Sequence, residues 1–339
     1  MSDATIRNYH IDNFRFHNGS PAAPVQLAFL DLNPTASKTA LVLTCFRDRL
    51  QPTLAFNDGA LKHYRVIVVA LCGNGESSSP SNMANPPSYF DYQDCVRMQH
   101  ALLASHLGIE MLDVVVGFSM GGQCAYHWTL MHPNMVRNAV VICSSARTSR
   151  HNHQSLEGPK AALENSRDYE KQRGAPSASL AKPLAGLQAF GKAYSAWLTS
   201  PAWFEQEMYK SLGYESLSAW DHDFAGTNYH SWHPEDLLSK IRTWQKGDVT
   251  AIFASEDLSL EQACARIRAR VLLLPCDTDQ YFRWEASARE ARWIPDATLR
   301  VIRSEWGHLA GLGVNRADKE WMDARIDEFL SQEDHDDGP

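Results

Sequence analysis

Six short runs of apolar, largely β-branched residues constrain the fold of this 339-residue chain more than any other feature. In the runs at 40–46, 65–72 and 112–118, apolar residues follow one another without alternating with polar ones, as in strands that are buried on both faces of a sheet. The runs are ALVLTCF at 40–46, RVIVVALC at 65–72, LDVVVGF at 112–118, NAVVICS at 138–144, RVLLLPCD at 270–277 and TLRVIRS at 298–304. Helical patterns alternate with several of them, so the sequence predicts an α/β fold with a mostly parallel central sheet covered by helices on both faces.

The first sixty residues follow a different pattern. Polar and apolar residues alternate on both sides of Asn18 and Gly19, a dipeptide that is typical of a turn between antiparallel strands. We therefore expect antiparallel strands at one edge of the sheet.

The stretch at 149–266 has no convincing buried strand, and parts of it could be helical. Five of the ten tryptophans fall in it, at positions 197, 203, 220, 232 and 244. The sequence predicts a core domain formed by 1–148 and 267–339, with 149–266 inserted as a helical cap. The tryptophans either line a binding site or fill the interior of the cap, and the second role is the more common one for large aromatics.

Composition narrows the function classes. The formal net charge is −8, and the 32 basic residues are scattered, which disfavours nucleic acid or an anionic membrane as partner. The seven cysteines show no metal-ligand spacing and indicate free thiols in a reducing compartment. No leader pattern and no run of about 18 apolar residues is present, so we expect a cytoplasmic protein with a small-molecule partner and no metal or cofactor.

Ser119 lies in the pattern GFSMGG at 117–122, directly after the run 112–118 and before a predicted helix. A serine on such a sharp turn between strand and helix is typical of a nucleophile, because the turn lifts the hydroxyl clear of the sheet. Small neighbours are needed there so that strand and helix can approach each other. The alternative is a tight turn with a purely structural role.

A serine hydroxyl needs a base, and the base needs an acid that orients it. Asp277 and Asp279 both follow the predicted strand VLLLPC at 271–276, and His308 follows the last run, 29 residues after Asp279. Asp279 is the preferred acid because it lies three residues past the strand and three before Phe282, which leaves Asp277 to brace the loop. Acyl transfer also needs backbone N–H donors for the oxyanion, which we predict from Met120 and from Phe46 or Arg47.

Several segments resemble the homoserine O-acetyltransferase branch of the α/β-hydrolase superfamily. They are 72–82, 94–109, 117–149, 186–197, 271–282 and 304–308, with the combination SMGG, SSAR and DTDQ. The resemblance implies the α/β-hydrolase fold, with Ser119 as nucleophile, Asp279 as acid and His308 as base. It also implies an acyl-serine intermediate on a ping-pong path, and it leaves a homodimer open because relatives of this branch are often dimers.

Two departures bear on the substrate. Members that acetylate homoserine usually carry an acidic residue after the catalytic histidine, where this chain has Leu309, and a Thr-Gly segment where it has TCFRDRL at 44–50. We therefore expect hydrolysis of a small ester or related acyl compound. The alternatives are an O-acyltransferase with acetyl-CoA as co-substrate and a non-catalytic ligand receptor on the same scaffold.

Overall fold

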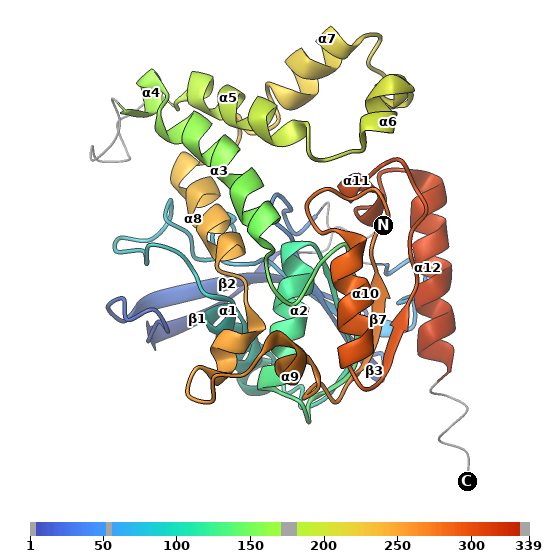
Figure 1. Ribbon diagram of the computed structural model, residues 1–339. Coiled ribbons are helices and arrows are strands. Elements are labelled where there is room, and N and C mark those ends of the chain that lie inside the picture. Colours follow the sequence, from blue (N-terminus) through green and yellow to red (C-terminus); the bar gives the residue numbers. More distant parts are fainter. Residues whose placement is uncertain (1–4, 52–55, 171–181, 333–339) are drawn as a thin grey trace.

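An eight-stranded sheet runs through the protein, with the strand order β1-β2-β4-β3-β5-β6-β7-β8 (Figure 1). The computed structural model describes residues 5–51, 56–170 and 182–332. All pairs from β4 to β8 are parallel, and β1 and β2 are antiparallel to their neighbours. The strands are β1 (Arg7–Phe14), β2 (Ala23–Leu32), β3 (Lys38–Leu43), β4 (Tyr64–Val69), β5 (Leu112–Phe118), β6 (Val136–Ile142), β7 (Arg270–Leu274) and β8 (Ala297–Leu299). The predicted mostly parallel sheet with an antiparallel edge is confirmed.

The last two strands are shorter than predicted. The expected runs were 270–277 and 298–304, but the regular ladder stops at Leu274 and Leu299. Pro275 has no N–H to donate, so the ladder between the two strands is interrupted there. Pairing returns as a single parallel bridge between Cys276 and Ile302, and Ile302 still donates to the Pro275 carbonyl at 2.8 Å.

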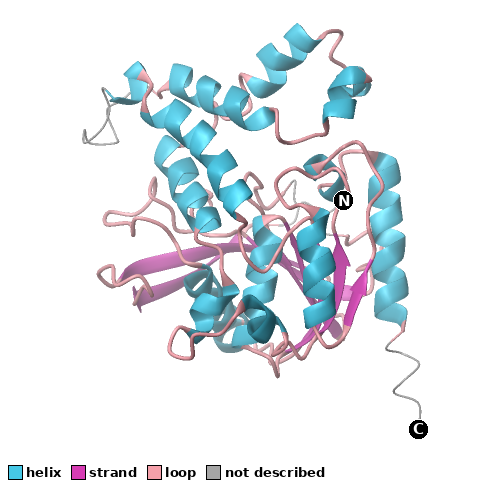
Figure 2. Cartoon of the chain, viewed as in Figure 1, coloured by secondary structure: helices cyan, strands magenta, loops and turns pink. Residues whose placement is uncertain are grey.

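Helices pack around the sheet in the described parts of the chain outside 149–266 (Figure 2). They are α1 (Tyr92–Ala101), α2 (Met120–Met131), α10 (Trp284–Trp293) and α12 (Arg316–Ser331), with the short α11 (His308–Gly311) near the last of them. After α1 the chain continues as a π-helical turn, η1 (Leu102–His106), before the left-handed Gly108 at φ +65°. The helical patterns expected to alternate with the strands are therefore present at α1, α10 and α12.

The described residues between β6 and β7 form helices and turns and no strand. Figure 1 shows α3 to α7 beyond the end of the sheet, whereas α9 lies back at the core, where it contacts α10. The elements are α3 (Arg150–Glu164), α4 (Arg167–Glu170), α5 (Leu184–Ser195), α6 (Pro201–Glu205), η3 (Met208–Leu212), α7 (Leu217–Trp220), η4 (Asp221–Ala225), α8 (Pro234–Gln245), η5 (Val249–Phe253) and α9 (Leu260–Cys264). We call residues 143–269 the β6–β7 segment; its division from the core at 149 and 266 stays a prediction.

Four of the five tryptophans in the β6–β7 segment are buried: Trp203, Trp220, Trp232 and Trp244. They support the interpretation that these aromatics mainly fill the interior of the segment. All seven cysteines are buried and free. In the described ranges, no helix has the length and hydropathy that crossing a membrane would require.

Candidate active site

The turn from β5 into α2 places Ser119 in a strained backbone conformation, with φ +57° and ψ −122°. Non-glycine residues rarely adopt a positive φ, and such strain persists only where the surrounding structure enforces it. A Cβ atom on Gly117 would lie 2.1 Å from the Gly121 carbonyl oxygen, so no larger residue fits at this crossing. The predicted reason for the small neighbours is therefore present, and it fixes the position of the Ser119 side chain.

Three predicted residues form one continuous chain of hydrogen bonds. His308 Nε2 lies 2.9 Å from Ser119 Oγ, and His308 Nδ1 lies 2.7 Å from Asp279 Oδ2. A carboxylate only accepts, so Nδ1 carries the proton and Nε2 is left to accept from the serine hydroxyl. All three side chains are buried, with exposed fractions of 1 to 4%. The arrangement can transfer the proton of Ser119 to His308 in a site shielded from bulk water.

Asp279 is also held from its other oxygen. Its Oδ1 accepts hydrogen bonds from the backbone N–H groups of Tyr281 at 2.8 Å and Phe282 at 3.1 Å. Asp277, the other acidic residue considered, instead contacts Arg303 Nη1 at 3.0 Å and the backbone N–H of Ser304 at 3.3 Å. The structure therefore brings Asp279 to His308 and leaves Asp277 bracing the loop after β7, as the sequence predicted.

The predicted oxyanion donors lie in one corner of the sheet. Met120 begins α2, and Phe46 follows β3 with its ring buried. A Cβ on Gly121 would lie 2.5 Å from the Leu43 carbonyl oxygen, so the end of β3 runs against the first turn of α2. Arg47, the other residue considered for the second donor, has an exposed side chain. The oxyanion role of the Met120 and Phe46 N–H groups stays a prediction.

Aromatic rings surround the imidazole of His308. The centroids of Phe118, Tyr281 and Phe282 lie 4.7, 5.3 and 5.8 Å from its own, and Trp244 of α8 stacks on Phe282 at 5.4 Å. Such a lining lowers the local dielectric constant and strengthens the electrostatic interactions along the hydrogen-bonded chain. The site is thus closed in part by residues of the β6–β7 segment.

Comparison with known proteins identifies the family to which this chain belongs. A family model described as alpha/beta hydrolase fold matches residues 40–312. The chain belongs to the α/β-hydrolase family. The resemblance to the α/β-hydrolase superfamily noted from the sequence is confirmed.

Similar proteins include both esterases and acyltransferases. The chain is 33% identical to an ethyl acetate hydrolase of Pseudomonas veronii over 79% of this chain and 76% of that protein. It is 28% identical to a homoserine O-acetyltransferase of Trichormus variabilis over 73% of this chain and 70% of that one. An acetylester hydrolase from Corynebacterium glutamicum superposes with a TM-score of 0.88 at 26% identity, covering 96% of each chain. Relatives named as esterases therefore accompany the acetyltransferase branch that the sequence resembles.

Lys240 of α8 is a residue that the sequence analysis of this α/β-hydrolase missed. Its side chain is fully buried, and its Nζ donates to the Cys45 carbonyl oxygen at 2.7 Å. Burial is the largest cause that lowers the pKa of Lys240, to about 8. A signal was available, because Lys240 falls at helical spacing between Leu237 and Trp244, on the apolar face of α8.

Cys143 was also missed. It directly follows β6 in a left-handed conformation with φ +43°, and its Sγ and the ligand atoms of Asp279 and His308 all lie within 4.8 Å of one another. Burial first, and the charge of Asp279 second, raise the pKa of this thiol well above its usual value. A neutral thiol is a poor nucleophile, so Cys143 packs beside the hydrogen-bonded chain and does not compete with Ser119.

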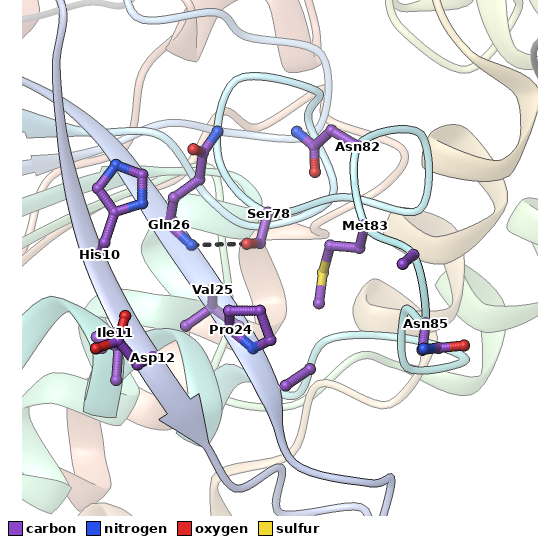
Figure 3. Close-up of a pocket in the computed structure, with 12 residues that line it drawn as sticks. His10, Ile11, Asp12, Pro24, Val25, Gln26, Ser78, Asn82, Met83 and Asn85 are labelled. Carbon is purple, nitrogen blue, oxygen red and sulfur yellow. Dashed lines mark hydrogen bonds between the residues drawn. The ribbon is translucent and has the colours of Figure 1, made fainter.

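A separate surface pocket of about 270 Å³ lies between the β1–β2 edge and the loop at 78–85 (Figure 3). The hydrogen bond from the Gln26 N–H to Ser78 Oγ, at 2.8 Å, joins its two walls. None of the predicted site residues lines this pocket, so the chemistry of the predicted site does not extend to it.

Proposed function

We propose that this chain is a serine esterase that hydrolyses acetyl or other short acyl esters of small alcohols through an acyl-Ser119 intermediate. The observation that carries the proposal is the buried chain of hydrogen bonds from Asp279 through His308 to the strained Ser119. The names of the relatives supply the substrate class, because an ethyl acetate hydrolase and an acetylester hydrolase are among them.

The reaction follows from this geometry. As Ser119 Oγ attacks the ester carbonyl, its proton passes to His308 Nε2, and the Asp279 carboxylate stabilises the imidazolium. The backbone N–H groups of Met120 and Phe46 bind the oxyanion of the tetrahedral intermediate. The C–O bond then breaks, and His308 protonates the departing alcohol. Water repeats the sequence on the acyl-serine, giving its proton to His308 and releasing the carboxylic acid and free Ser119.

The residue after the base favours hydrolysis over homoserine acetylation. Leu309 is buried, and its N–H donates to the carbonyls of Trp306 at 3.1 Å and Leu198 at 3.3 Å. Its apolar side chain offers no carboxylate to an amino-acid ammonium group at this position. The proposed acceptor is therefore water.

Acyl transfer from acetyl-CoA to an alcohol is the second candidate. The burial of Ser119 favours it, since an acyl-serine reaches an alcohol only where water is kept out. A receptor without chemistry is the third possibility, and an unreactive Ser119 would distinguish it.

One experiment separates the three. The pure protein is incubated with 4-nitrophenyl acetate, ethyl acetate, or acetyl-CoA with and without homoserine, and product release and intact mass are followed. An esterase releases acetate from the esters, and Ser119→Ala lowers that rate by at least about 10⁴-fold. CoA release that depends on homoserine would favour transfer. A fluorophosphonate that fails to label the wild type, with no ester turned over, would contradict both enzymes.

Location, assembly and domain division are part of the proposal. The seven buried thiols support a reducing compartment such as the cytoplasm. A homodimer is proposed from the resemblance, and light scattering during size-exclusion chromatography would measure it. The core of 1–148 and 267–339 with a cap at 149–266 is proposed from the helical β6–β7 segment.

A further inference from the structure

Lys240 lies in a buried environment that disfavours a charged side chain. Its exposed fraction is 0%. Its Nζ donates a hydrogen bond to a neutral acceptor, the Cys45 carbonyl oxygen. Among the described residues, no carboxylate oxygen lies within 4.0 Å of Nζ, and the nearby acid Asp48 acts on it from farther away. Burying a cation without a paired anion costs several kcal/mol in general. The lysine therefore calls for an explanation beyond packing.

The acceptor of Lys240 belongs to the peptide group that precedes Phe46. Peptide groups are planar, and the described chain contains no cis peptide bond. In a trans peptide the carbonyl oxygen and the next N–H point in opposite directions. Since Nζ holds the Cys45 oxygen on one side, the Phe46 N–H is aimed to the other side, away from α8.

The first turn of α2 lies next to this peptide. The carbonyl oxygens of Leu43 and Thr44 would be 2.5 and 3.0 Å from a Cβ on Gly121, so the chain reaches Cys45 directly after passing this turn. The rest of the loop is held by other bonds: Thr44 Oγ1 accepts from Leu71 N–H at 2.9 Å, and Asn74 Nδ2 donates to the Asp48 carbonyl at 3.3 Å. Rings of the β6–β7 segment pack on the Phe46 side chain, with centroids of Phe190, Tyr194 and Trp244 at 6.4, 5.4 and 5.7 Å. Lys240 adds a hydrogen bond from the same segment to the backbone of this loop, at the Cys45 carbonyl oxygen.

We propose that Lys240 is a positioning residue that holds the Cys45–Phe46 peptide so that the Phe46 N–H is aimed at the oxyanion. A cation at the carbonyl oxygen also polarises the amide, which makes its N–H a stronger donor. Helix α8 thereby contributes to stabilisation of the tetrahedral intermediate without touching the substrate. The inference rests on the proposed esterase function.

The test compares Lys240→Met with Ser239→Ala, a matched control in the same turn of α8. Ser239 is buried, and among the described residues its hydroxyl has no hydrogen-bond partner, so its removal should leave turnover unchanged. Steady-state kinetics with 4-nitrophenyl acetate give kcat and KM. A trifluoromethyl ketone, which adds to the serine to form a hemiketal oxyanion, reports the oxyanion site directly. Circular dichroism and thermal unfolding check that each variant folds.

We expect Lys240→Met to lower kcat by about 10- to 100-fold with KM within about threefold, less than the loss of a whole oxyanion donor. The inhibition constant of the trifluoromethyl ketone should rise by a similar factor, while Ser239→Ala stays near the wild type. A folded Lys240→Met with unchanged kcat and unchanged ketone inhibition overturns the inference. If this variant does not fold, Lys240→Gln replaces it and is judged by the same two ratios.

Failure of the proposed function is read separately, on the wild type. A wild-type protein that turns over none of the esters and forms no acetyl-Ser119 contradicts the esterase. An active wild type whose folded Lys240 variants match it contradicts only the role of Lys240.

Discussion

The two sides of the proposed active site, the nucleophile with its base and acid and the loop after β3, differ in how their backbone is held. On the nucleophile side, the Ser119 N–H donates to the Ile142 carbonyl at 2.9 Å and the Asp279 N–H to the Cys276 carbonyl at 3.3 Å, so the backbone of each residue is bonded to the end of a core strand or the loop after it. The β6–β7 segment adds a bond beside the base, where the Leu309 N–H donates to the Leu198 carbonyl at 3.3 Å. On the oxyanion side, the loop after β3 receives a hydrogen bond from Lys240, which belongs to the β6–β7 segment. The backbone of Ser119 and Asp279 is thus bonded within the core, whereas alignment of the Phe46 N–H depends on a side chain of α8.

The largest effect is expected on the nucleophile side. Asp279→Asn should lower kcat/KM by about 10³- to 10⁴-fold, because an amide no longer fixes the Nδ1–H tautomer of His308. Asp277→Asn is the matched control and should change it by less than about threefold, since Asp277 contacts Arg303 and Ser304 instead. Steady-state kinetics on both variants decide the assignment. Equal losses would show that the loop, and not the Asp279 carboxylate, governs His308.

Alanine substitutions at two glycines allow the core and the β6–β7 segment to be compared, because the added Cβ would be equally crowded at both positions. A Cβ would lie 2.1 Å from the Gly121 carbonyl oxygen at Gly117 in the core, and 2.1 Å from the Ala225 carbonyl oxygen at Gly191 in α5. Gly117→Ala should shift Ser119 and reduce activity by at least about 10²-fold, since a displacement near 1 Å has that effect. Gly191→Ala should change mainly KM, by less than about tenfold.

Fluorophosphonate labelling rates and thermal unfolding accompany these two kinetic measurements. Slow labelling of Gly117→Ala and near-normal labelling of Gly191→Ala would support the division of roles. If Gly191→Ala abolished labelling while remaining folded, the β6–β7 segment would be part of the nucleophile side as well.

The smallest effect on activity is expected at Glu290 of α10. It accepts from Tyr126 Oη at 2.6 Å and from the Ala146 N–H at 2.9 Å, and burial raises its pKa to about 7. A raised pKa in the folded state stabilises the protein at low pH, and this contribution is lost as pH rises from about 4.5 to about 7. Glu290→Gln does not titrate, so its free energy of unfolding relative to wild type should rise over that range by about 1–3 kcal/mol.

Denaturant unfolding at pH 5 and pH 8 measures this change, with activity at pH 7 expected within about threefold of wild type. A stability difference that is the same at both pH values would contradict the raised pKa. Glu290 is thus a buried ionisable group of the core with a packing role, in contrast to Lys240.

Much of the fold could be predicted from the apolar runs along the chain. Strands buried on both faces have few polar positions, and each of the six predicted runs overlaps a strand, although β8 is only half-buried and covers Thr298 and Leu299 of its run. Their ends were less predictable, because a single missing N–H at Pro275 interrupts pairing that hydropathy alone would continue. The lengths of β7 and β8 depend on this missing donor and not on hydropathy.

The residues of the hydrogen-bonded chain were predictable because each follows a strand at the same edge of the sheet. Lys240 was not, since a lysine in a helix is usually exposed and its burial depends on where α8 packs. The loop after β3, which carries the predicted oxyanion donor Phe46, was only partly predictable. Its place after β3 follows from the strand, but its register depends on a contact with a helix nearly 200 residues later, Lys240 to Cys45.

The order of the sheet also has a consequence for synthesis of the chain. Strand β7 pairs with β6 only after residues 143–269 have been made. At about 5–20 residues per second, that interval lasts roughly 6 to 25 seconds. During it the edge of β6 has no neighbour on that side, and an uncovered strand edge is a site of aggregation. Early folding of the helices between β6 and β7 would shorten the distance over which β7 must search for β6. These helices would therefore serve the folding of the nascent chain before they serve substrate binding.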